Sequence, residues 1–152
     1  GAAGADTEGL LGAVSVGGSA VVFLADSLEA HVADQRYQKL LESQRIVLVS
    51  EQGPDLEFST PRALSRNRLI HAMGQKVLVA QSDYGSGGTW NGTLENLKAQ
   101  WSPVLMFAGE PDDPGTRGLV ERGALPITLS DLNNLSTLGE EQRSLFERLR
   151  RK

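Results

Sequence analysis

The chain has no cysteine and only two histidines among its 152 residues. Without thiols it cannot form disulfides or thiolate metal sites, and it cannot use a cysteine nucleophile. Two isolated histidines are too few to build a histidine-rich metal site. We therefore expect no bound metal, neither structural zinc nor an iron–sulfur cluster.

Long apolar runs are also missing. No stretch approaches the roughly 18 consecutive apolar residues that a membrane-spanning helix needs, and no basic region followed by an apolar stretch marks a secretory signal. Apolar residues at 39% and charged residues at 22% are ordinary for a globular protein. We expect a cytoplasmic protein with one compact core and no membrane partner.

The charge is unevenly distributed along the chain. Its formal net charge is −4, yet the window between Glu57 and Asp83 holds no acid and four basic residues. These are Arg62, Arg66, Arg68 and Lys76. The window thus carries +4, and the remainder sums to −8, because −4 minus +4 is −8. Sequence-independent DNA affinity scales with the number of phosphates neutralised, so any anion site must be local.

Five short apolar runs have the length of strands. They are Ala20–Leu24, Ile46–Ser50, Val77–Gln81, Val104–Phe107 and Leu125–Thr128. Continuous rather than alternating apolar residues are typical of strands buried on both faces of a parallel sheet. We expect helices before and between them, at Thr7–Val16, Asp34–Ser43, Pro61–Met73, Asn91–Trp101 and Gly115–Arg122. This alternation predicts an α/β fold, an open, mostly parallel sheet with helices on both faces.

The two ends of the chain differ from this pattern. The stretch Gly1–Asp6 resembles a glycine turn that opens a helix with no strand before it, so we hypothesise that an upstream strand or a βαβ unit is missing. From residue 129 onwards the chain changes character, and Thr137–Glu140 resembles a capping box. The predicted tail helix is either a surface helix that matches its dipole or a packing or oligomer element. We expect one domain at 1–128 and a helical tail at 129–152.

Arg66 lies near the start of a predicted helix, where ligands of such sheets bind and where free N–H groups attract anions. Arg62 and Arg66 share the helix face expected to meet the sheet, whereas Arg68 points to solvent. A guanidinium on the inner face needs an anion or a carboxylate. Three alternatives remain open: ligand phosphate, an internal salt bridge, for example to Glu51 or Asp83, and simple solvation at the helix start.

A glycine-rich segment, Gly85–Gly92, follows a predicted strand and precedes a helix. Its small residues let backbone amides approach a phosphate, but neither GxGxxG nor the P-loop motif is present. The segment is either an ordinary turn or one wall of a phosphate-binding crevice. Tyr84 and Trp90 flank it and either pack into the protein or stack on unpaired bases. Glu95, at the start of the next predicted helix, either complements the dipole or acts as an acid or base.

Several segments carry a family resemblance in their order and spacing. They are Gly1–Asp6, Val47–Glu51, Ser65–Ile70, Ser86–Trp90 and Leu119–Ala124. Together they resemble the DNA-processing protein A (DprA/Smf) family over approximately residues 1–128, and Arg66-Asn67-Arg68 is the most specific part. The resemblance implies a Rossmann-like domain, here without the first strand or strands of the full family domain.

Members of that family bind single-stranded DNA and help to load the RecA recombinase during natural transformation, often as dimers. The resemblance implies a binding protein in DNA uptake or recombination, with no cofactor and no catalysis. Its ligand would be single-stranded DNA or a nucleotide, and its partners a RecA-type recombinase and a second copy. The implied phosphate contacts are Arg66, Asn67, Arg68, Gly87, Gly88, Thr89, Gly1 and Gly4. The family usually has an arginine where Ala3 stands, so one cation is missing.

Two alternative functions stay open. The related LONELY GUY or lysine-decarboxylase-like phosphoribohydrolases cleave nucleoside monophosphates with an arginine and a Gly-Gly-x-Gly-Thr-x-x-Glu loop. Gly92-Thr-Leu-Glu95 partly matches that loop, with two extra residues between Gly88 and Gly92, and would make Glu95 catalytic in N-glycosidic bond hydrolysis. The other alternative is a sensor domain that binds a small nucleotide without turnover.

Overall fold

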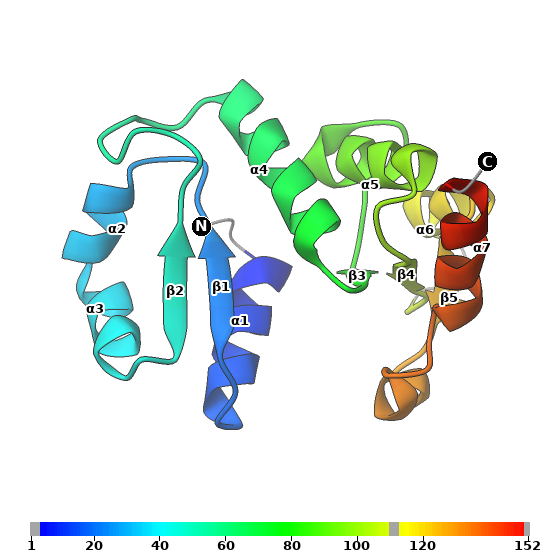
Figure 1. Ribbon diagram of the computed structural model, residues 1–152, viewed down its shortest axis with the longest axis horizontal. Coiled ribbons are helices and arrows are strands. Elements are labelled where there is room, and N and C mark those ends of the chain that lie inside the picture. The colour runs from blue at the N-terminus through cyan, green and yellow to red at the C-terminus, as the bar shows by residue number, and fades with distance from the viewer. Residues whose placement is uncertain (1–3, 110–112, 151–152) are drawn as a thin grey trace. The chain divides into compact units, whose positions relative to one another are not determined.

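The computed structural model describes residues 4–109 and 113–150 (Figure 1). The chain divides into two compact units, Gly1–Arg66 and Asn67–Lys152. Each unit contains short parallel strands with connecting helices (Figure 1). Helix α4 (Thr60–Met73) contributes its first half to one unit and its second half to the other.

The first unit is built on a pair of parallel strands, β1 (Ala20–Phe23) and β2 (Ile46–Val49). Helix α1 (Ala5–Ser15) precedes β1, and α2 (Leu28–Ala33) and α3 (Gln35–Glu42) form the crossover between the strands. Each strand lies where its apolar run predicted it.

Helix α2 was missed by the sequence analysis, and its caps explain why it is separate from α3. The Ser27 hydroxyl accepts a hydrogen bond from the Ala30 N–H at 3.1 Å. Asp34 ends α2 and begins α3, where its carboxylate accepts from the Arg36 N–H at 2.9 Å. Serine and aspartate are preferred N-caps, so the segment forms two short helices rather than one.

The second unit has three parallel strands in the order β3 (Val77–Val79), β4 (Val104–Phe107) and β5 (Leu125–Ile127). Helix α5 (Gly87–Ala99) connects β3 to β4, and α6 (Pro114–Val120) connects β4 to β5. A 3-10 helix, η1 (Ser130–Asn134), and α7 (Glu140–Arg150) follow. The expected alternation of strands and helices and the parallel pairing are confirmed.

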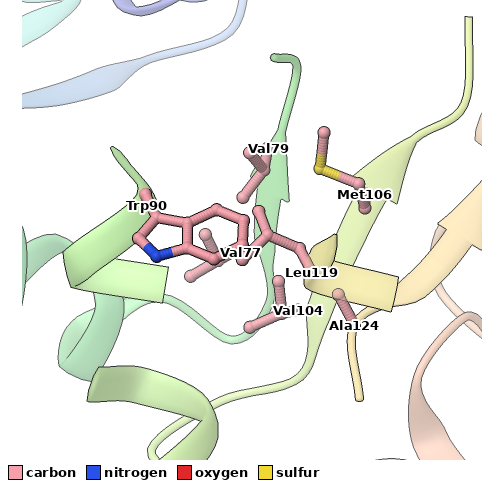
Figure 2. Packing of buried hydrophobic residues seen from close by; sticks show 7 residues of the cluster. All are labelled: Val77, Val79, Trp90, Val104, Met106, Leu119 and Ala124. Atoms are coloured by element: carbon pink, nitrogen blue, oxygen red, sulfur yellow. The ribbon is translucent and has the colours of Figure 1, made fainter. Parts of the chain in front are cut away.

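The core of the second unit forms where α5 and α6 meet β3 and β4. Trp90 from α5 and Leu119 from α6 converge on valines of the two strands (Figure 2). The central strand β4 is fully buried at Val104, Leu105 and Met106, each with 0% exposure. The core members are Val77, Val79, Trp90, Val104, Met106, Leu119 and Ala124. Burial on both faces, expected for every strand, therefore holds for the central one.

The outer strands are more open than their apolar runs predicted. Val21 and Val47 face each other across β1 and β2 and are 56% and 58% exposed. Leu78, in the middle of β3, is 50% exposed. A continuous apolar run thus identified each strand but not which of its faces is covered.

Helix α5 begins four residues earlier than expected, at Gly87 rather than Asn91. Glycines disfavour a helix by about 1 kcal/mol each, which is why the sequence pattern favoured a loop here. Trp90 and Thr93, only 4% and 0% exposed, lie in the first two turns. Their burial stabilises helical backbone that local propensity disfavours.

The segment after residue 128 is tied to the second unit by hydrogen bonds. The Lys76 ammonium donates to the carbonyls of Leu135 and Ser136 at 2.7 and 2.6 Å. The Gln142 amide accepts from the Val104 N–H at 3.0 Å and donates to the Gly123 carbonyl at 2.6 Å. Gln142 thus attaches helix α7 to the second unit, while Glu140 and Glu141 lie in its first turn as the helix dipole prefers. Within the described residues, no helix has the length and apolar character to cross a membrane.

Candidate nucleic-acid interface

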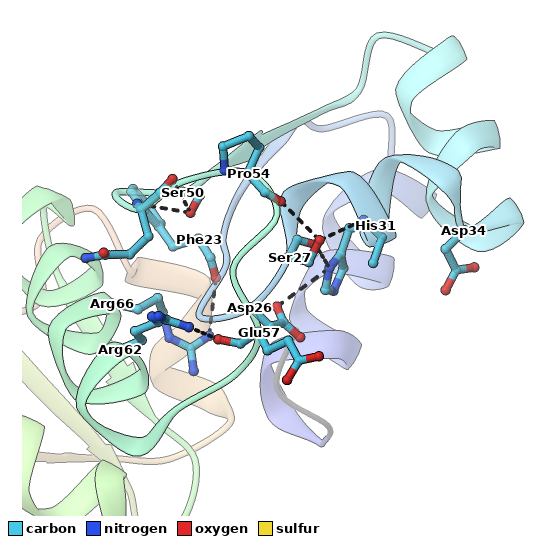
Figure 3. A network of polar contacts seen from close by, with 12 residues as sticks. Phe23, Asp26, Ser27, His31, Asp34, Ser50, Pro54, Glu57, Arg62 and Arg66 are labelled. Carbon is cyan, nitrogen blue, oxygen red and sulfur yellow. Dashed lines mark hydrogen bonds and ion pairs between the residues drawn. The ribbon is translucent and has the colours of Figure 1, made fainter.

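Arg66 reaches the carboxyl end of β1. Its Nη1 donates to the carbonyl of Phe23, the last residue of the strand, at 3.3 Å (Figure 3). Its Nε is buried and has no hydrogen-bond partner among the residues that the structure describes. The salt bridge to Glu51 or Asp83 considered above does not form within this part of the chain. The guanidinium thus retains its full charge and an unused donor.

Arg62 adds a second cation on the same face of α4. It lies four residues before Arg66, a spacing that places both side chains on one helix face. Its Nη1 donates to the main-chain carbonyl of Glu57 (Figure 3). In the described part of the chain neither guanidinium is paired with a carboxylate. Carbonyl dipoles do not neutralise a charge, so both guanidinium groups keep a charge that can attract an anion.

Asp26 and His31 lie at the same strand end, and the sequence analysis did not single them out together. Asp26 Oδ1 is buried without a hydrogen bond from any described residue, and it lies 3.6 Å from His31 Nδ1. That nitrogen also lies 3.0 Å from the Ser27 carbonyl, to which it donates (Figure 3). Polar residues that follow a predicted strand were the available signal. No partner of His31 was visible in the sequence.

In the second unit, Gly87, Gly88 and Thr89 form the exposed first turn of α5. The first N–H groups of a helix have no intrahelical partner, and the Ser86 side chain at the N-cap makes no capping bond in the described structure. Gly85 and Gly87 have φ of +74° and +84°, and a Cβ on either would meet no described atom within 4 Å. The turn is therefore open and rich in donors, which suits an anion.

Asn67 is brought to this turn, whereas the opening turn of the chain belongs to the other unit. The Asn67 Nδ2 lies 3.5 Å from the Gly88 carbonyl, a long hydrogen bond. Gly4 is the exposed N-cap of α1, with φ of +86°. Gly1 lies outside the described residues. The structure thus joins one of the implied side chains to the glycine turn.

Arg68 is exposed, as expected, but it has a partner. Its Nε lies 2.9 Å from the carboxylate of Glu95, and the two side chains are 57% and 40% exposed. Glu95 lies in the third turn of α5 because the helix begins at Gly87. It therefore neither complements the start of the helix nor stands alone in a crevice. Its charge opposes the attraction of Arg68 for a phosphate.

If Arg68 contacts a phosphate of single-stranded DNA, as the family resemblance implies, replacing Glu95 with glutamine should strengthen oligonucleotide binding by about two- to fivefold, because exposed ion pairs contribute up to about 1 kcal/mol. Fluorescence anisotropy with a labelled oligonucleotide measures the change. Glu141→Gln on α7 is the matched control, since both variants change the net charge from −4 to −3. Equal effects of the two variants would show that only total charge matters.

A buried polar network links α4 to α5. The Asn96 Nδ2 donates to His71 Nδ1 at 3.1 Å, and the Ser102 N–H donates to Asn96 Oδ1 at 3.1 Å. The Ser102 hydroxyl donates to the His71 carbonyl at 2.8 Å. Since His71 Nδ1 accepts, Nε2 carries the proton of the neutral ring. Burial lowers the pKa of His71, although the nearby Glu95 charge opposes this.

His71 is therefore a neutral structural group, and its partners were not visible in the sequence. Sequence reasoning could not find this network, because its members are separated by up to 31 residues along the chain. Among the described residues, no group of three or more histidine, aspartate or glutamate side chains is placed to hold a metal ion.

Comparisons with known proteins point to one family. The family model of DNA recombination-mediator protein A matches residues 1–135. The X-ray structure of DNA processing protein A (DprA) from Streptococcus pneumoniae is similar, with a TM-score of 0.67 and 22% sequence identity. The similarity covers 82% of this chain and 44% of that one, so this chain spans less than half of the length of that protein. No curated protein sequence matches. At this identity the structural similarity shows the fold.

Proposed function

Because the chain belongs to the DNA recombination-mediator protein A family, we propose that it is a DNA-processing protein that binds the phosphates of single-stranded DNA. The family resemblance supports a role in DNA uptake or recombination. On the same basis we propose a RecA-type recombinase and a second copy of the chain as partners, a family domain at 1–128, and the cytoplasm as its location.

The observation that carries the proposal is the state of Arg66. Its guanidinium lies at the carboxyl end of a parallel strand, where ligands of such folds bind. Its buried Nε has no hydrogen-bond partner in the described residues, and leaving a buried donor unpaired is costly. A phosphate bound at this half-buried guanidinium would neutralise its charge. Arg62, four residues earlier on α4, adds a second charge for the same anion.

The overall negative charge favours binding through contacts to only a few DNA phosphates. At a net charge of −4 the chain repels nucleic acid at long range. Binding then depends on a few shaped contacts. The candidates are Arg66 in the first unit and, separately, the first turn of α5 with Asn67 in the second. Affinity should consequently fall only gently as the salt concentration rises, because few counterions are released.

Replacing Arg66 with alanine should weaken binding of a single-stranded oligonucleotide by about 1–3 kcal/mol, or roughly 5- to 150-fold. The loss of one phosphate contact should also reduce the slope of log K against log salt by about 0.7. Titrations at several salt concentrations measure both quantities.

Arg36→Ala is the matched control, because it removes one positive charge from a side chain that is 85% exposed and paired with Asp34. It should leave both quantities nearly unchanged. An Arg66→Ala variant with the affinity of the parent protein would remove Arg66 from the site.

Measurements with mononucleotides and with oligonucleotides test the two alternative functions. A phosphoribohydrolase would release free base from nucleoside monophosphates, and Glu95→Gln would abolish that release. A sensor domain would be stabilised against heat by a mononucleotide but not by oligonucleotides. Tight binding of oligonucleotides without base release supports the proposed function over both.

A further inference from the structure

Tyr84 presents an exposed aromatic ring in the second unit, between β3 and α5. Its side chain is 57% exposed, whereas the neighbouring Trp90 is 4% exposed. The sequence left packing and base stacking open for both residues. Burial assigns Trp90 to the core (Figure 2) and leaves Tyr84 accessible.

The Tyr84 ring is supported from the protein side. Its centroid lies 5.0 Å from that of Trp90, with a tilt of 56° between the rings. The backbone of α6 passes close by, because a Cβ on Gly118 would lie 2.6 Å from Tyr84 Cε2 and 2.8 Å from Trp90 Cη2. Arg122 lies over Trp90 at 5.3 Å and donates to the Gly118 carbonyl at 2.8 Å. The Tyr84 ring is thus packed along its Cδ2–Cε2 edge, while 57% of the residue stays exposed.

The backbone that leads to Tyr84 is held as well. Ser82 is 6% exposed. Its carbonyl oxygen would lie 1.7 Å from a Cβ on Gly115, so the chain presses directly against the start of α6. A ring positioned in this way loses little conformational freedom when a ligand stacks on it.

We propose that Tyr84 is a stacking platform for an unpaired nucleobase. The inference rests on the proposed function, which it deepens by naming a contact to the base rather than to the phosphate. Base–aromatic stacking contributes about 1–3 kcal/mol per base and tolerates any sequence. Asp83, the exposed residue that precedes Tyr84 in the chain, adds a negative charge that disfavours a phosphate at this segment. The open first turn of α5 supplies donors for a phosphate in the same unit.

The test compares an oligothymidylate with an abasic oligonucleotide of the same length. The parent protein should bind the oligothymidylate at least about fivefold more tightly. Tyr84→Leu should abolish this preference by weakening only the base-containing ligand, and Tyr84→Phe, which keeps the ring, should retain it. The binding of a mononucleotide is measured as well, and it shows whether the stacked base comes from a free nucleotide or from a DNA strand.

The outcomes separate this inference from the proposed function. If Arg66→Ala weakens binding but Tyr84→Leu changes both ligands equally or neither, stacking is overturned and the proposed function stands. If the parent protein binds no oligonucleotide, the proposed function fails, and the inference fails with it. Equal affinity of the parent protein for both ligands overturns stacking without the use of any variant, so a folding defect in Tyr84→Leu cannot hide the answer.

Discussion

Replacing Gly115 with alanine will lower the free energy of unfolding of the second unit by about 3 kcal/mol. The new Cβ would lie 1.7 Å from the Ser82 carbonyl oxygen and 2.8 Å from its carbonyl carbon. Both are backbone atoms, so no side-chain rotation relieves the clash. Helix α6 is held at its start, where the Asp113 carboxylate accepts from the Thr116 N–H at 2.6 Å. The helix must move as a whole, which disturbs the packing of Leu119.

Denaturant unfolding followed by tryptophan fluorescence measures this change, because both tryptophans, Trp90 and Trp101, lie in the second unit. Gly12→Ala in α1 is the matched control. A Cβ there would meet no described atom within 4 Å, and Gly12 lies in the first unit, so alanine should leave the tryptophan-detected unfolding of the second unit unchanged. An unchanged unfolding midpoint for Gly115→Ala would mean that α6 does not press on Ser82.

Replacing Asn96 with alanine should cost the second unit about 2–4 kcal/mol of unfolding free energy. Asn96 is 0% exposed, and its amide bonds both His71 Nδ1 and the Ser102 N–H. Alanine leaves these two groups buried without a partner, and each unsatisfied group costs about 1–3 kcal/mol. The cavity adds to the loss.

Asn91 lies on the same helix and is exposed, so Asn91→Ala is the control. It should change the free energy of unfolding by less than about 0.5 kcal/mol. Chemical denaturation of the two variants under identical conditions gives the comparison. Equal stability of the two variants would contradict a structural role for the network.

The losses of stability expected for Gly115→Ala and Asn96→Ala bear on the proposed interface, because Tyr84 and the first turn of α5 lie on segments that the core of the second unit holds in place. Tyr84 and the first turn of α5 follow β3, and their positions depend on Gly115, Gly118 and the burial of Trp90. Binding groups on loops are effective when a rigid scaffold positions them. Variants of the scaffold should therefore weaken DNA binding as well as folding.

The sequence by itself located the strands and most helices, because apolar runs and their spacing are local properties. It missed α2, although the N-cap residues Ser27 and Asp34 were present. It also placed the start of α5 too late, since propensity alone cannot register the burial of Trp90 and Thr93. Local signals thus predict which elements exist better than where each begins.

For the interface, the sequence alone determined that a basic window precedes a glycine-rich turn and that the chain resembles a DNA-processing family. Only the tertiary structure decided that Arg66 bonds the Phe23 carbonyl rather than an acid, that Glu95 pairs with Arg68, and that Tyr84 rather than Trp90 is exposed. The physical reason is distance along the chain. Partners 27 to 43 residues apart meet only through packing of the whole unit, which no local pattern encodes.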